Sequence, residues 1–276
     1  MATKIPLREV RGLDKNYRPI CQTAPDEDTR ISSGILYPEI NIGVPGKALS
    51  AICIPPSFQP TGSIDVVLYL HGITSDEPRY RDIRDYWNDR DLPWFLNSYG
   101  GRMIMVAPTL GPSAQAGELH TRHFALHYLR QVRQCLVDHG PYQPGSPLPQ
   151  IGRLILAAHS GGGITMLHLA RALAGSIKIP ECWGFDCMYG DVEESWLEWA
   201  QGDRIFRVFW SSTRARAENI DYLAKKRHNP NVQLEVPFFQ ERSGGEPVRV
   251  PNTPQPETIH RYVPLLYFGE CLVGVN

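Results

Sequence analysis

The segment Leu154–Gly163 constrains the fold of this chain most, because it joins three different signals. It reads L-I-L-A-A-H-S-G-G-G. Its apolar run predicts a buried strand, and the spacing of apolar residues after it predicts a helix. Between the two lies a sharp turn, which must strain the backbone to project the Ser160 hydroxyl outward. The positions two before and two after Ser160 should crowd each other, and they hold the small residues Ala158 and Gly162.

Strands and helices alternate along the rest of the chain. Two β-rich runs, Gly34–Ile42 and Ala48–Ile54, flank a G-V-P-G turn and predict an antiparallel hairpin. Further strands are predicted at Ile64–Gly72, Arg102–Ala107, Arg153–Ala158, Cys182–Met188, Ile205–Trp210 and Val232–Val236. Helices are predicted in parts of Arg79–Asn97, interrupted by Pro93, and at His120–Asp138, Gly163–Leu173, Asp191–Ala200, Ala215–Lys226 and Val263–Leu272. This order predicts an α/β fold, a mostly parallel central sheet with helices on both faces.

The chain is expected to form one domain. Its 276 residues suffice for one large α/β domain with a substantial core, and no interdomain linker is apparent. We expect residues 1–30, which are polar and mixed, to form an N-terminal extension, and residues 31–276 to form the domain.

Charge and apolar runs exclude several classes of function. The formal net charge of −1 does not indicate binding to nucleic acid or to an anionic membrane. No run of 18 or more apolar residues predicts a membrane span, and the N-terminus has no apolar signal core. We therefore expect a cytoplasmic protein, although a secreted chain without its signal peptide would look the same. The sequence does not indicate an oligomeric state.

The chain has six cysteines but no C-x-x-C pair, so a zinc or redox motif is not expected. Most of them lie in apolar surroundings, which favours buried free thiols over disulfides. The six are Cys21, Cys53, Cys135, Cys182, Cys187 and Cys271.

The turn A-H-S-G-G resembles the G-x-S-x-G nucleophile elbow of the α/β-hydrolase superfamily, and in particular of its serine esterases and lipases. Alanine replaces the first glycine. The resemblance implies an α/β-hydrolase fold with Ser160 as nucleophile, next to a helix N-terminus that favours developing negative charge. The alternative is that Ser160 only caps the helix. The strand before it and the helix after it favour the nucleophile.

A second element of the resemblance is L-H-G-I, Leu70–Ile73, at the end of a predicted strand. In the superfamily this loop supplies one amide of the oxyanion hole. The resemblance therefore implies that the backbone N–H groups of Ile73 and Gly161 stabilise the oxyanion. His71 can at the same time pack under the loop.

The superfamily order of nucleophile, acid and histidine leaves three histidines after Ser160. His168 falls inside the helix after the elbow, and His228 precedes the last strand. His260 is expected in the loop after that strand, just before the closing helix, where the family keeps its base. We therefore predict His260 as the general base.

The acid is harder to assign. The superfamily usually carries it after the seventh strand, but no carboxylate follows that strand until Glu218. Asp186 ends the preceding strand among apolar residues, where a buried carboxylate needs a partner such as His260. We rank Asp186 first, then Glu218, then Asp191. The alternative for Asp186 is a structural carboxylate that caps the next helix.

Other candidates are weaker. His71, His159, Trp87 and Trp94 could line a substrate pocket, with core packing as the alternative for the aromatic residues. Glu118 and three histidines share a predicted helix and its start, but a solvated helix face is favoured over a metal site. Those histidines are His120, His123 and His127. No motif indicates a cofactor.

These features predict a serine hydrolase that cleaves small carboxylic esters through an acyl-enzyme on Ser160. Serine at the elbow, in place of aspartate, argues against dehalogenase or epoxide hydrolase chemistry. Two alternatives stay open: an amidase or peptidase that uses the same three residues, and a non-catalytic binding protein with the same fold.

Overall fold

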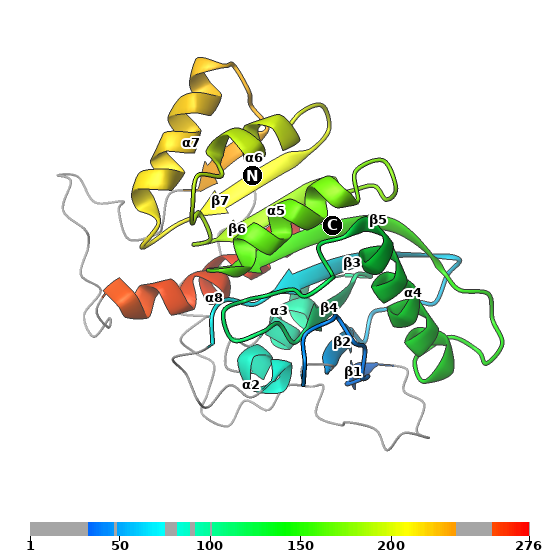
Figure 1. The fold of residues 1–276 in the computed structure, drawn as a ribbon. Helices are drawn as coiled ribbons and strands as arrows, with labels where there is room; N and C mark the ends of the chain where they lie inside the picture. Colours follow the sequence, from blue (N-terminus) through cyan, green and yellow to red (C-terminus); the bar gives the residue numbers. More distant parts are fainter. Residues whose placement is uncertain are drawn as a thin grey trace.

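A computed structural model describes residues 33–46, 49–74, 82–88, 92–99, 101–235 and 256–275. The N-terminal extension expected at residues 1–30 lies outside this part of the chain. The described residues form one eight-stranded sheet in the order β1-β2-β4-β3-β5-β6-β7-β8 (Figure 1). The strands are β1 Gly34–Leu36, β2 Ser50–Ile54, β3 Ser63–Leu70, β4 Ile104–Pro108, β5 Gln150–His159, β6 Glu181–Phe185, β7 Ile205–Phe209 and β8 Val232–Glu235.

The pairing of the strands confirms the predicted sheet. β1 pairs antiparallel with β2, and β2 pairs antiparallel with β4. From β4 to β8 all neighbouring strands run parallel. The carboxyl ends of six strands therefore meet at one edge of the sheet, which is where ligands bind in open α/β folds.

The apolar run of β3 reflects burial on both faces of the sheet. Val66, Leu68 and Leu70 pack in one hydrophobic cluster. Val67 and Tyr69 pack in a second cluster on the other face. A strand buried on both faces needs apolar residues at nearly every position, so its sequence does not alternate.

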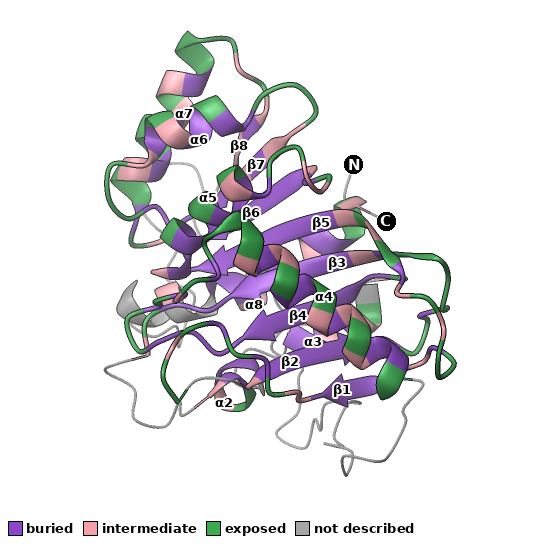
Figure 2. Ribbon diagram, turned by 45° about the vertical axis from the view of Figure 1, so that its right-hand side comes forward, coloured by how far each residue is buried: buried purple, intermediate pink, exposed green. Residues whose placement is uncertain are grey.

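Helices cover both faces of the sheet (Figure 2). One face packs against α4, α5, α6 and α7, and the other packs against α2, α3 and α8. The helices are α2 Ile83–Asn88, α3 Leu92–Tyr99, α4 Arg122–Asp138, α5 Gly162–Ala172, α6 Glu193–Trp199, α7 Arg214–Lys226 and α8 Pro256–Val275.

Two sequence-based expectations about helices were wrong. The closing helix begins at Pro256, so His260 lies within α8 and not in a loop before it. The first two turns of α8 lack the apolar spacing on which the prediction rested, although proline suits the start of a helix. Pro93 does not interrupt a helix either. It is the second residue of α3, where its missing N–H costs no hydrogen bond.

The cysteines of the described residues are free thiols, as predicted. Cys53, Cys182, Cys187 and Cys271 are buried, and Cys135 is partly buried. Burial raises the pKa of Cys182 and Cys271 well above its usual value, so these thiols stay protonated. Cys21 lies outside the described residues. No helix in the described segments is long and apolar enough to cross a membrane.

We predict that Gly163→Ala destabilises the protein by about 1–3 kcal/mol, as overpacking does in a close-packed interior. A Cβ at this position would lie 2.4 Å from the Cys187 carbonyl oxygen and 2.7 Å from the Cys187 Cβ. Urea unfolding followed by circular dichroism measures the change. Gly62→Ala is the control, because a Cβ there meets no atom within 4 Å. Equal stability of the two variants would contradict the crowding.

Candidate active site

Ser160 lies at the carboxyl end of β5 in a strained backbone conformation. Its φ is +52°, although it is not glycine. Its N–H donates to the Phe185 carbonyl at 3.1 Å, which ties the turn to the neighbouring strand β6. Non-glycine residues rarely adopt positive φ, and such strain often occurs at functional sites. The structure thus has the sharp strand-to-helix turn that the sequence predicted.

The three glycines after Ser160 each face a close neighbour. A Cβ at Gly161 would lie 2.9 Å from the Ile73 side chain. At Gly162 it would lie 2.6 Å from the Leu70 carbonyl oxygen, and at Gly163 it would strike Cys187. The nearest neighbours that keep position 162 small are therefore at the end of β3.

The loop after β3 lies directly against Ser160. A Cβ at Gly72 would fall 2.6 Å from the Ser160 Cβ, and Ile73 contacts Gly161. The structure therefore brings both predicted oxyanion residues, Ile73 and Gly161, to the turn that carries Ser160. The Ile73 side chain is 49% exposed.

His71 supports this loop from below. Its Nδ1 lies 2.7 Å from the Gly72 carbonyl oxygen, and its Nε2 accepts the Leu110 N–H at 2.8 Å. Because a carbonyl only accepts, Nδ1 carries the proton. The side chain is buried with both ring nitrogens engaged, which favours the packing role over a substrate contact.

Asp186 follows β6 at the same edge of the sheet and is fully buried. It accepts hydrogen bonds from the backbone N–H and the hydroxyl of each of three residues that follow β7. These are Ser211, Ser212 and Thr213, with the backbone bonds at 2.8, 3.0 and 2.8 Å. Thr213 is the N-cap of α7, so the carboxylate also lies at a helix N-terminus.

This environment keeps Asp186 ionised. Burial alone would raise the pKa of its carboxyl group. Hydrogen bonds from His260, Ser211 and Thr213 outweigh burial and hold the pKa well below its usual range. The capping alternative from the sequence is thus partly right, but the helix is α7 and not the next helix, α6.

His260 forms a partly buried hydrogen bond with Asp186. Its Nδ1 lies 2.5 Å from the Asp186 Oδ2 and 3.3 Å from the Ser212 Oγ. Its ring lies against that of His159, with 4.6 Å between centroids. Because His159 directly precedes Ser160, the imidazole of His260 lies on the same side of the molecule as the elbow.

Tyr189 also joins Ser160 to His260, and sequence reasoning missed it. Its ring stands perpendicular to that of His260 at 6.3 Å, and it is 38% exposed. Burial raises its pKa, while hydrogen bonds to Ser212 and Ser160 lower it. The balance is a raised pKa, so the hydroxyl stays protonated beside Ser160. Ser211–Thr213 were also missed, although an S-S-T run before a helix is an N-cap signal.

The other acid candidates are engaged elsewhere. Glu218 pairs with Arg214 at 2.7 Å, and Asp191 pairs with Arg216 at 2.5 Å. Neither carboxylate is buried. Of the three ranked acids, only Asp186 lies beside His260.

The remaining pocket and metal candidates divide as follows. Trp87 is fully buried, and Trp94 packs against Phe95, which favours core packing for both. His159 is 3% exposed and faces Tyr86 and α8 rather than open space.

His120 lies near His168 on α5, with 6.2 Å between ring centroids. Among the residues with described placement, no cluster of histidine, cysteine and carboxylate side chains could hold a metal ion.

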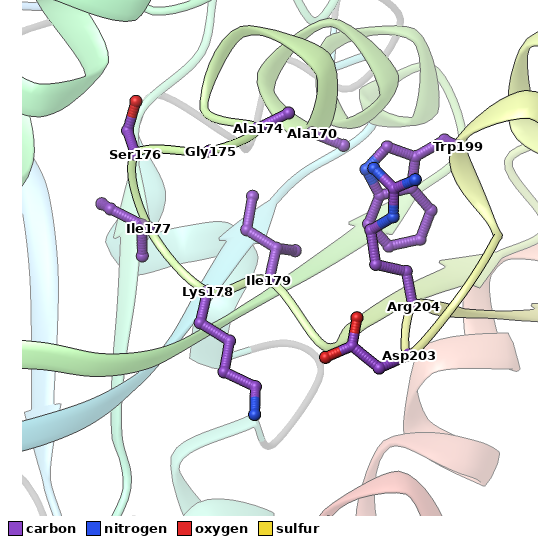
Figure 3. Close-up of a pocket in the computed structure, with 10 residues that line it drawn as sticks. All are labelled: Ala170, Ala174, Gly175, Ser176, Ile177, Lys178, Ile179, Trp199, Asp203 and Arg204. Carbon is purple, nitrogen blue, oxygen red and sulfur yellow. The ribbon is translucent and has the colours of Figure 1, made fainter.

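A cavity of about 350 Å³ is lined by residues such as Ile179, Trp199 and Arg204 (Figure 3). Ile179 precedes β6 and Arg204 precedes β7, so the cavity is at the amino ends of these strands. Arg204 stacks over Trp199 at 5.5 Å. Because Ser160 and Asp186 follow the carboxyl ends, this cavity is separate from the candidate active site.

Comparisons with known proteins support the fold. No family model and no curated protein matches the chain. Its structure is similar to that of a ferulic acid esterase, with a TM-score of 0.51, 14% identity, and coverage of 87% of this chain and 99% of that one. A feruloyl esterase module from Clostridium thermocellum gives a TM-score of 0.48 and 14% identity, over 90% and 93%. With the strand order, the first likeness establishes the predicted α/β-hydrolase fold.

We predict that Asp186→Asn lowers the free energy of unfolding at pH 7 by about 1.5–3 kcal/mol, the range for hydrogen bonds to a charged group. The depressed pKa stabilises the fold above the unfolded pKa of about 4, and this contribution is lost as the pH falls below it. The difference in the free energy of unfolding between the wild type and Asp186→Asn should therefore become smaller at acidic pH. Urea unfolding at several pH values measures it.

The control for this prediction is Asp191→Asn, which removes an exposed carboxylate from an ion pair. Exposed pairs contribute little, so this variant should follow the wild type at every pH. A gap between wild type and Asp186→Asn that stays constant down to pH 3 would contradict the assignment of an ionised Asp186.

Proposed function

We propose that this protein is a serine hydrolase that cleaves carboxylic esters, with Ser160 as nucleophile, His260 as general base and Asp186 as the acid. The observation that carries the proposal is the hydrogen-bonded Asp186–His260 pair, which lies against His159, the residue just before a serine held at positive φ. A structural serine at a helix start would need neither the strain nor the histidine.

The direction of the hydrogen bonds fits a base. Asp186 is ionised and can only accept, so His260 donates its Nδ1 proton to it. The neutral imidazole then keeps its Nε2 free of a proton, which is the state that accepts a proton from a hydroxyl. Asp186 fixes this tautomer and stabilises the imidazolium that forms during the reaction.

The reaction proceeds in two halves. The Ser160 Oγ attacks the ester carbonyl carbon while the Nε2 of His260 takes its proton. The negative oxygen is bound by the N–H groups of Ile73 and Gly161, and its collapse expels the alcohol, which takes the proton from His260. Water then attacks the acyl-enzyme while His260 takes its proton. The ester bond to Ser160 breaks, the carboxylic acid leaves, and the Ser160 oxygen receives the proton back from His260.

Esters are the first substrates to test. The similar solved structure with a TM-score above 0.5 is named an esterase. The exposed side chains of Ile73 and Tyr189 flank the turn that carries Ser160 and offer an apolar and aromatic surface for the acyl or alcohol group.

We predict that Ser160→Ala and His260→Ala each lower the kcat for a p-nitrophenyl ester by about 10⁴-fold or more, as loss of a nucleophile or its base does. A fluorophosphonate should phosphonylate Ser160 with loss of fluoride, which mass spectrometry of the wild type locates. Ser98→Ala, on the exposed side of α3, is the matched control and should keep full activity.

The outcomes separate the candidate functions. Wild-type protein that resists the fluorophosphonate and cleaves no ester would overturn the proposal in favour of a binding protein. Faster turnover of a p-nitroanilide than of the matched ester would overturn it in favour of an amidase.

A further inference from the structure

A chain of buried hydrogen bonds joins the loop after β3 to the backbone of His260. The Gly72 N–H donates to the Tyr86 Oη at 3.2 Å. The Tyr86 Oη lies 2.5 Å from the His159 Nδ1, and the His159 Nε2 lies 2.8 Å from the His260 carbonyl oxygen. Tyr86 and His159 are 1% and 3% exposed.

The acceptor at the end of this chain fixes its direction. A carbonyl oxygen cannot donate, so the His159 Nε2 carries a proton and donates it to His260. In a neutral imidazole the Nδ1 is then an acceptor, and the Tyr86 hydroxyl donates to it. The Tyr86 Oη at the same time accepts a hydrogen bond from the Gly72 N–H. The donor and the acceptor of every hydrogen bond in the chain are therefore defined.

Pro264 explains why the His260 carbonyl needs this donor. In an α-helix the carbonyl of residue 260 accepts from the N–H of residue 264. Residue 264 of α8 is proline, which has no N–H and whose ring crowds the carbonyl four residues earlier. The carbonyl of His260 therefore has no N–H donor at residue 264, and the Nε2–H of His159 donates a hydrogen bond to it instead.

We propose that His159 is a positioning residue for His260, an inference that rests on the proposed hydrolase function. Its Nε2–H holds the His260 carbonyl that Pro264 leaves without a helical donor, and Tyr86 extends the network to the oxyanion loop. The network thereby fixes the position of His260, the general base, relative to the loop after β3. His159 itself touches neither substrate nor the proton that moves.

The test is a double-mutant cycle. His159→Leu should lower kcat for a p-nitrophenyl ester by about 10- to 100-fold, the loss expected from a misplaced catalytic group, with KM changed less than about threefold. Pro264→Ala restores an N–H at residue 264, so His159→Leu should cost much less in the Pro264→Ala background. A purely structural core histidine would cost the same in both backgrounds, and that result would overturn the proposal.

A conservative variant adds a second readout. His159→Gln keeps an N–H donor near the position of Nε2 and should retain activity within about fivefold of wild type. Tyr86→Phe, which removes the hydroxyl that is bonded to His159, should have an activity between those of His159→Gln and His159→Leu. His168→Leu is the matched control, since His168 lies on the exposed side of α5. Equal loss in His159→Gln and His159→Leu would contradict a role for the donor.

A measurement independent of turnover separates the two proposals. Proton NMR should show a far-downfield resonance for the His260 Nδ1–H bonded to Asp186, kept in His159→Gln and broadened or lost in His159→Leu. If Ser160→Ala stays active, the proposed function fails, and the resonance still tests His159. If Ser160→Ala is inactive but His159→Leu keeps wild-type kcat and resonance, only the positioning role fails. If His159→Leu does not fold, the Gln and Phe variants decide by the same readouts.

Discussion

The Asp186 carboxylate is the point on which the candidate site depends. It ends β6, receives six hydrogen bonds from the three residues between β7 and α7, and pairs with His260 on α8. These donors pay for the burial of a charge that would otherwise be costly. They also bind four elements of the fold to one another. Residues 211–213 hold the carboxylate independently of His260, so they also help to fix the position of the His260 imidazole that is bonded to it.

Strain at Ser160 is tolerated because its surroundings leave no alternative. The backbone is held by β5 on one side and α5 on the other, and the next three positions are crowded by Ile73, Leu70 and Cys187. Side chains there would push α5 away from the ends of β3 and β6. The glycines therefore let the helix start close to the sheet, and this closeness brings the loop after β3 against Ser160. The serine conformation and the position of the loop after β3 follow from the same packing.

The sequence predicted the sheet, its hairpin and the helices on both faces, because apolar periodicity and glycine or proline boundaries are local signals. It also predicted that Asp186 and His260 come together, although Asp186 was only the first of three choices. It could not predict the donors around Asp186 or the contact between His159 and α8, which join residues 25 to 101 positions apart. The start of α8 was misplaced because its first turns are polar. The sequence left Trp87 open between pocket and core because a tryptophan in a core and one in a pocket look alike in sequence.

The groups of this site fall into a buried set and an exposed set. Asp186, His159 and Tyr86 are almost completely enclosed, so their hydrogen bonds are made in a low-dielectric interior and are costly to break. Ile73 and Tyr189 are partly exposed and lie beside Ser160, where a change of side chain disturbs few buried contacts. A fold arranged in this way can keep its chemistry while the bound group varies. Under the proposed function, the exposed set would decide the preference for one ester over another, while the ability to cleave any ester would depend on the buried one.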